Sequence, residues 1–167
     1  MRIVELDKSR KELILPQLFA IMHANMSVIA PIGNSYEEDL SFWLSCVSSE
    51  LEKEPRRILL IYDGDEIAGF FQYSVSNGLF MMEAIQLRDR YQGTGVFGEL
   101  YAYLTRIIPK DTEFVEAYAN KGNHKSIAVL KHLGLEIIGE KKTVSPTISE
   151  ADMKPFSADT EMLEFYP

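Results

Sequence analysis

The stretch Gln92-Gly93-Thr94-Gly95-Val96-Phe97-Gly98 lies between two apolar patterns of this 167-residue chain. The run before it, 79–87, predicts a β-strand, and the apolar spacing after it, 96–108, predicts a helix. Glycines between a strand and a helix let the backbone approach a ligand closely. The unpaired N–H groups of the first helical turn then face an anion. The stretch therefore predicts a phosphate-binding loop.

Upstream of this loop the sequence predicts an antiparallel meander. Apolar β runs at 58–62, 67–75 and 79–87 are separated by the hairpin signals Asp63-Gly64 and Asn77-Gly78. Sequential strands joined by such tight turns pair antiparallel.

A strand at 2–6 and two helices are expected before the meander. Ser9 with Glu12, and Ser35 with Glu38, have the spacing of capping boxes, each ahead of an apolar helical segment. Pro16 predicts that the first helix starts or bends at that residue.

Downstream, the pattern predicts a strand at 114–119 and a short helix between Asn123 and Gly134. A strand at 135–139, a long loop at 141–159 and a closing strand at 160–166 complete the chain. The order β-α-α-β-β-β-α-β-α-β-β mixes hairpins with crossovers. It predicts an α/β (α+β) fold whose mixed, mostly antiparallel sheet of 6–7 strands is flanked by about four helices. Without repeats or linkers, residues 1–167 are expected to form a single domain.

Composition limits the partners. The chain carries 25 acidic and 17 basic residues, a net charge of −8. This charge argues against a nucleic-acid partner and favours a cationic substrate. No apolar run approaches the roughly 20 residues needed to cross a membrane, so no membrane partner and a cytoplasmic location are expected. One cysteine, Cys46, and three histidines lack metal-ligand spacing, so no metal site is predicted.

The glycine pattern Gly93 to Gly98 also matches the dinucleotide motif G-x-G-x-x-G. Five residues, 88–92, separate it from the strand, however, and only about 70 residues follow it. The preceding strands are joined by hairpins rather than by crossovers. A Walker loop is excluded because no Gly-Lys-Ser/Thr occurs.

Two blocks carry a more specific similarity. In 87–96, Gln92 to Gly95 match the pattern Gln/Arg-x-x-Gly-x-Gly/Ala, with Phe97 at its last position. In 123–135, the pattern Asn-x-x-Ala-x-x-x-Tyr-x-x-Leu-Gly-Phe is matched by Asn123, Leu133 and Gly134, with Leu130 at the Tyr position. Together they resemble the GNAT (general-control-related N-acetyltransferase) superfamily, over about residues 58–140.

The resemblance implies acetyl-CoA as co-substrate. Its pyrophosphate would bind the amides of residues 93–97. Its pantetheine arm would fit where the strand ending at Leu87 splays from the strand starting near Phe114. Asn123 would either contact the arm or cap its helix, and Phe97 would either narrow the pyrophosphate seat or face the core. The implied cofactor-binding residues are Ile85, Leu87, Gln92, Gly93, Thr94, Gly95, Val96, Phe97, Asn123 and Leu130.

The resemblance also implies the chemistry. Glu83 is the candidate base, and strand alternation predicts one shared face for Glu83, Ile85 and Leu87. Partial burial would raise the pKa of Glu83 toward neutrality. A backbone N–H near Leu87 would stabilise the oxyanion.

The family's usual acid is a tyrosine, and Leu130 has no proton to donate. Either a nearby tyrosine, Tyr118 or Tyr166, replaces it, or water suffices because a thiol has a pKa of about 8.5.

The first expectation is therefore an acetyl-CoA-dependent N-acetyltransferase that acts on a primary amine of a small cationic metabolite or amino sugar. A protein N-terminal or lysine acetyltransferase is the second. The third is a non-catalytic acyl-CoA-binding module, an alternative that remains because Leu130 replaces the usual acid. In the resembling fold a late strand often pairs between subunits, which implies a homodimer.

Overall fold

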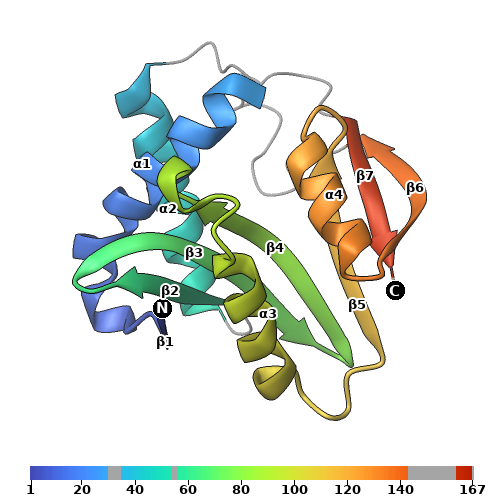
Figure 1. Ribbon diagram of the computed structural model, residues 1–167. Coiled ribbons are helices and arrows are strands. Elements are labelled where there is room, and N and C mark those ends of the chain that lie inside the picture. Colours follow the sequence, from blue (N-terminus) through green and yellow to red (C-terminus); the bar gives the residue numbers. More distant parts are fainter. Residues whose placement is uncertain (30–34, 54–55, 143–160, 167) are drawn as a thin grey trace.

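The computed structural model describes residues 1–29, 35–53, 56–142 and 161–166 (Figure 1). Its strands and helices follow the predicted order. The strands are β1 (Arg2–Glu5), β2 (Arg56–Asp63), β3 (Glu66–Ser76), β4 (Leu79–Leu87), β5 (Phe114–Asn120), β6 (Glu136–Lys142) and β7 (Glu161–Tyr166). The α-helices are α1 (Lys11–Ile29), α2 (Tyr36–Glu52), α3 (Val96–Ile107) and α4 (His124–His132), and the short 3₁₀ helices are η1 (Lys8–Arg10) and η2 (Asp89–Tyr91).

The seven strands form one sheet in the order β1-β2-β3-β4-β5-β7-β6. Every neighbouring pair is antiparallel except β4 and β5, which are parallel. The mixed, mostly antiparallel sheet predicted from the hairpins and crossovers is therefore confirmed. The predicted loop 141–159 begins two residues too early, because residues 141 and 142 belong to β6. Residues 143–160 lie outside the described residues.

Two predicted local motifs, a hairpin turn and a helix cap, are present at the ends of their elements. Asn77 and Gly78 both have positive φ, 50° and 76°, which is the conformation of a type I′ hairpin turn. The capping box at the start of α2 is complete. The Glu38 amide donates to the Ser35 hydroxyl, and the Ser35 amide donates to the Glu38 carboxylate.

The first predicted capping box is wrong. Asp7 caps η1 instead, and its carboxylate accepts from both the amide and the hydroxyl of Ser9 at 2.9 and 2.8 Å. An earlier carboxylate competes with Glu12 for Ser9, so a 3₁₀ turn precedes α1. The helix then begins at Lys11 and continues through Pro16.

Two apolar clusters cover the two faces of the sheet. We call the first the α3 core, since it contains Val96, Leu100 and Leu104 of α3 together with Leu130 of α4. We call the second the α1–α2 core, which packs residues of α1 and α2 against β2 and β3. Alternate residues of β3 divide between them: Phe71 and Tyr73 belong to the α3 core, and Phe70 to the α1–α2 core.

One segment, Lys8–Ile29, is long and apolar enough by length and composition to cross a membrane, which differs from the sequence expectation. Its apolar residues have a packing explanation in the fold. Ile14, Leu15, Leu18 and Ile21 are buried in the α1–α2 core, each no more than 4% exposed.

Cys46 of α2 is partly buried, as a small core residue would be. Burial raises the pKa of its thiol, an effect that Arg56 partly offsets. Because a raised pKa leaves fewer thiols ionised, we expect iodoacetamide to modify the folded chain at least about tenfold more slowly than the urea-unfolded chain. Equal rates at mildly alkaline pH, followed by mass spectrometry, would contradict this expectation.

Candidate active site

The glycine loop presents its backbone to open space. Gly93 and Gly95 have φ of +73° and +89°, and an added Cβ at either residue would meet no atom within 4 Å. The Thr94 hydroxyl donates to the Tyr91 carbonyl at 2.8 Å and so shapes the turn. The amides of residues 93–97 donate no hydrogen bond to any described residue. Five consecutive donors at a helix start form a cradle for an anion.

Side chains from α1 and the loop hold the end of β4. The Leu87 carbonyl accepts from Asn25 Nδ2 at 3.0 Å and from Gln92 Nε2 at 3.2 Å. Asn25 Nδ2 also lies 2.8 Å from the Gln86 side-chain oxygen. The start of the cradle is thereby fixed to the first helix.

The two parallel strands part beside this cradle. Their pairing runs from Leu79 with Phe114 to Met82 with Ala117. Beyond Ala117, β5 pairs with β7, and no described residue of 83–87 pairs with β5. Figure 1 shows β4 and β5 close together at one end and far apart at the other. The splay implied by the resemblance is therefore present in the sheet.

The far side of the splay is the start of α4. The Asn123 side chain accepts from the Ser126 amide at 3.1 Å, so it caps the helix, and its Nδ2 makes no hydrogen bond with a described residue. Lys125 Nζ donates to Gln92 Oε1 at 2.8 Å. This bond joins α4 to the glycine loop and holds the Lys125 ammonium against the side chain of Gln92, the residue before the five free amides.

Several predicted cofactor residues also belong to the core. Ile85, Leu87 and Phe97 pack against the α3 core, so the Phe97 ring faces the core. Leu130 is 7% exposed within the same cluster. No hydroxyl replaces the usual tyrosine at that position, because a leucine side chain fills it.

A β-bulge changes the face on which Glu83 lies. Gln72 of β3 pairs with Ala84 and Tyr73 pairs with Met82, so Glu83 is an extra residue in β4. Met82 and Ile85 therefore both face the α3 core, although three positions separate them. The prediction that Glu83, Ile85 and Leu87 share a face is wrong, because the bulge shifts the alternation between them.

The Glu83 carboxylate is bound on the α1–α2 side of the sheet. Arg56 Nη2 donates to Oε1 at 2.8 Å, Arg56 Nε lies 2.5 Å from Oε2, and Gln72 Nε2 donates to Oε2 at 2.9 Å. Arg56 also pairs with Glu50 of α2. The Glu83 side chain is 14% exposed, so a partly buried carboxylate with a fixed orientation lies beside the splay.

A second acid on this face is Glu116 of β5, which is only 6% exposed. Its neighbours Ala117 and Ala119 belong to the α3 core, so by alternation Glu116 and Tyr118 face the other side. The Tyr118 hydroxyl donates to the Glu116 carboxylate. Tyr118 therefore lies on the face opposite Leu130, and the side chain of Tyr166 is outside the described residues.

Sequence reasoning missed four of these residues: Asn25, Arg56, Lys125 and Glu116. Two had a signal. Glu116 is a charged residue inside an apolar strand, and Lys125 follows the predicted helix cap by two positions. Asn25 and Arg56 had none, because their partners lie on strands and loops distant in sequence.

Comparison with known proteins decides which family this arrangement represents. The family model described as "Acetyltransferase (GNAT) family" matches residues 17–135, more than half of the chain. The chain belongs to the GNAT acetyltransferase family. GNAT members use acetyl-CoA, which fits the free amides of the loop and the splay beside it. Membership indicates an N-acetyltransferase enzyme.

Solved GNAT structures share the fold at low identity. An aminoglycoside 6'-acetyltransferase type Ii matches with TM-score 0.66 and 15% identity, covering 100% of this chain and 96% of its own. The paia N-acetyltransferase from Thermoplasma acidophilum, in complex with coenzyme A, matches with TM-score 0.67 and 12% identity, covering 98% and 96%. The ribosomal-protein-S18-alanine N-acetyltransferase from Escherichia coli matches with TM-score 0.65 and 15% identity, covering 99% and 91%. No curated protein sequence matches this chain.

Proposed function

We propose that this GNAT protein transfers the acetyl group of acetyl-CoA directly to a primary amine of a small cationic metabolite or amino sugar. The observation that carries the proposal is the acidic character of the α1–α2 face beside the splay. Glu83 and Glu116 lie there with one guanidinium, Arg56, which Glu50 also shares. Three carboxylates against one cation favour a positively charged acceptor.

The proposed acetyl-CoA site uses the residues of the cradle. The amides of residues 93–97 would hold the pyrophosphate, with Gln92 and Lys125 at its edge. Asn123 would use its Nδ2, which makes no hydrogen bond with a described residue, to contact the pantetheine arm. Ile85, Leu87 and Leu130, which belong to or pack against the α3 core, would line the arm. Acetyl-CoA supplies the activated acetyl group as a thioester.

The proposed chemistry assigns one step to each polar group. Glu83 accepts a proton from the ammonium of the acceptor, directly or through water, and the neutral amine then attacks the thioester carbonyl. The Leu87 N–H stabilises the developing oxyanion. As the tetrahedral intermediate collapses, the carbon–sulfur bond breaks and the nitrogen loses its second proton to water. The thiolate leaves without a tyrosine beside it and takes up a proton from that water, since a thiol has a pKa of about 8.5.

A release assay tests the proposal. Free CoA is measured after mixing the chain with acetyl-CoA and spermidine, glucosamine, kanamycin or a peptide with a free N-terminus. We expect release with at least one small amine and little with the peptide. Release with the peptide alone would favour a protein acetyltransferase. Measurable acetyl-CoA binding without release for any amine would overturn the enzymatic proposal.

Lys125 provides a prediction about cofactor affinity. Replacing Lys125 with Met is expected to raise the Kd for acetyl-CoA about fivefold, because a cation beside the pyrophosphate is lost. Lys131→Met is the matched control, since Lys131 is an exposed lysine in the last turn of the same helix. Isothermal titration calorimetry compares them, and equal affinities in both variants would contradict the prediction.

The proposal also covers the organisation of the protein. Residues 1–167 act as one acetyltransferase domain in the cytoplasm, and two copies pair through β6, the edge strand of the sheet. Ile137 and Ile138 of β6 are 41% and 59% exposed, which supplies an apolar edge for that contact. Light scattering after size-exclusion chromatography tests it, and a monomer at assay concentration would contradict the dimer.

A further inference from the structure

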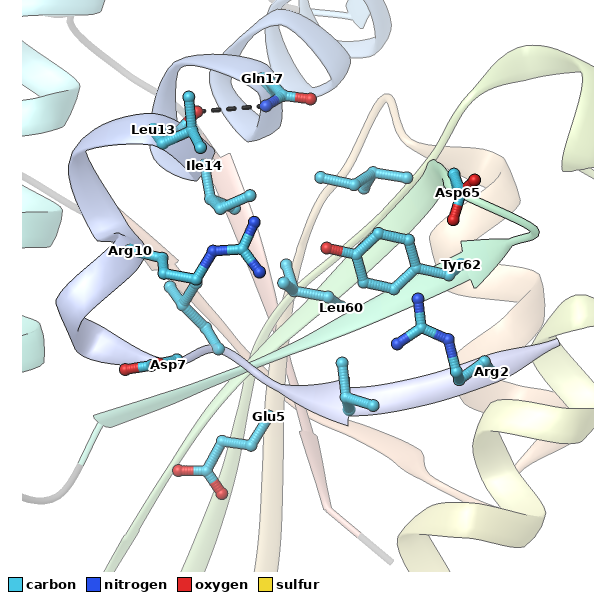
Figure 2. A pocket seen from close by; sticks show the side chains of 13 residues that line it. Arg2, Glu5, Asp7, Arg10, Leu13, Ile14, Gln17, Leu60, Tyr62 and Asp65 are labelled. Atoms are coloured by element: carbon cyan, nitrogen blue, oxygen red, sulfur yellow. Dashed lines mark hydrogen bonds between the residues drawn. The ribbon is translucent and has the colours of Figure 1, made fainter.

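A second hollow lies away from the glycine loop. It has a volume of about 350 Å³ and lies between β1, the first turns of α1 and the β2–β3 hairpin (Figure 2). Its apolar wall is formed by Val4, Ile14, Leu60 and Ile67. The candidate active site follows β4, whereas this hollow opens beside β1, β2 and the start of β3.

Two arginines reach this hollow from different elements. Arg2 pairs with Tyr62 across β1 and β2, and its guanidinium lies 4.3 Å from the centre of the Tyr62 ring. Arg10 comes from η1. Figure 2 shows the Arg10 guanidinium and the Tyr62 hydroxyl turned toward each other, with the Arg2 guanidinium beneath the ring. Two planar cations therefore flank one apolar wall.

Neither guanidinium has an ion pair or hydrogen bond with another side chain in the part of the chain that the structure describes. This is unexpected in a chain with 25 acidic residues. Of the acids around the hollow, Glu5 pairs with Arg57 at 3.2 Å. Asp7 accepts from the amide and hydroxyl of Ser9, and Arg10 attracts its carboxylate at longer range. Figure 2 shows the Glu5 and Asp7 carboxylates turned away from the space between the two guanidinium groups, and Asp65 on the far side of Tyr62. The two arginines therefore face the hollow without a carboxylate between them.

We propose that this hollow binds a small organic carboxylate, with its charged group between Arg2 and Arg10 and its apolar body on Ile14, Leu60 and Ile67. The planar fork of a guanidinium matches a carboxylate in a bidentate geometry. An apolar wall gains free energy by covering a hydrocarbon body, which a bare inorganic anion does not provide. Two unpaired cations disfavour an amine, so the acceptor of the acetyl transfer does not belong here.

A titration of the full-length chain tests the charge and the apolar body separately. The probe is sodium hexanoate, followed in ¹H–¹⁵N spectra. Hexylamine and hexan-1-ol have the same chain length, and sodium acetate has the charge with little hydrocarbon. We expect hexanoate to give saturable shifts at the Arg2 and Arg10 Nε–H groups and at the Ile67 amide, and the other three probes to give none. The proposal is overturned if hexanoate causes no saturable shift there, or if hexylamine shifts the same resonances as strongly.

Variants locate the site. Arg10→Gln is expected to raise the Kd for hexanoate about tenfold, because one charge-assisted contact is lost. Leu13 is 63% exposed at the rim, so Leu13→Glu is tolerated by the fold and is expected to reduce binding by repulsion. Arg106→Gln, at an exposed arginine in the last turn of α3, is the matched control and is expected to keep the native Kd. Native affinity in both Arg10→Gln and Leu13→Glu would overturn the proposal, as would an equal loss in Arg106→Gln.

Discussion

Glu83→Gln is expected to lower kcat by about two to four orders of magnitude, the range for loss of a general base. The substitution keeps the shape of the side chain and one oxygen that can accept from Arg56 or Gln72, while removing the ability to accept a proton. The Kd for acetyl-CoA should stay within about twofold, because Glu83 lies on the sheet face opposite the α3 core. Steady-state kinetics with the amine identified by CoA release, together with calorimetry for acetyl-CoA, measures both quantities.

Glu50→Gln is the control for this variant. Glu50 pairs with the same arginine from α2, so its substitution also removes one negative charge from Arg56. We expect kcat to fall no more than about fivefold, since a partly exposed ion pair contributes little. If Glu83→Gln retains full turnover at all pH values, Glu83 is not the base. If both variants lose activity equally, the carboxylates only position Arg56.

Gly69→Ala is expected to destabilise the fold by about 3 kcal/mol, the upper part of the range for overpacking. Gly69 of β3 is paired with Leu87. A Cβ there would lie 2.2 Å from the Gln86 carbonyl oxygen and 3.0 Å from the Leu87 Cα. Both are backbone atoms of β4, so the end of that strand must move. Acetyl transfer should fall too, because the same strand carries the proposed oxyanion donor.

Gly98→Ala is the matched control for stability. Gly98 lies in α3, and a Cβ there would meet no atom within 4 Å. Alanine in a helix is favoured over glycine by about 0.5–1 kcal/mol, so this variant is expected to be slightly more stable. Urea unfolding of both variants gives the comparison. Equal free energies of unfolding for Gly69→Ala and the native chain would show that β4 adjusts without cost.

The order of the elements was predictable because its signals are local. Asn77-Gly78 adopts positive φ without help from the rest of the chain, and Ser35 and Glu38 cap α2 within one turn. The glycine loop is likewise a local feature, since Gly93 and Gly95 supply the positive φ that frees the amides after them. The GNAT resemblance rests on the same short spacings.

The site was predicted only in part, because its polar groups depend on distant partners. Alternation from Leu87 back to Glu83 fails at the bulge, which arises from the pairing of β4 with β3 and has no signature within β4 itself. The anchoring of Leu87 by Asn25 requires α1 to pack beside the end of β4, 62 residues away. Neither relation is contained in the spacing of one segment.

The amino-acid sequence alone determined the succession of strands and helices and the glycine loop whose amides at 93–97 remain free, since each depends on neighbouring residues. It also shows directly that position 130 is a leucine. Folding in three dimensions determined the rest. The order of strands in the sheet places Glu83 against Arg56, brings Lys125 to Gln92, and leaves Arg2 and Arg10 around a second hollow. The physical reason is that side chains interact only when they are close in space, and strand pairing in the sheet brings together segments that are far apart in the sequence.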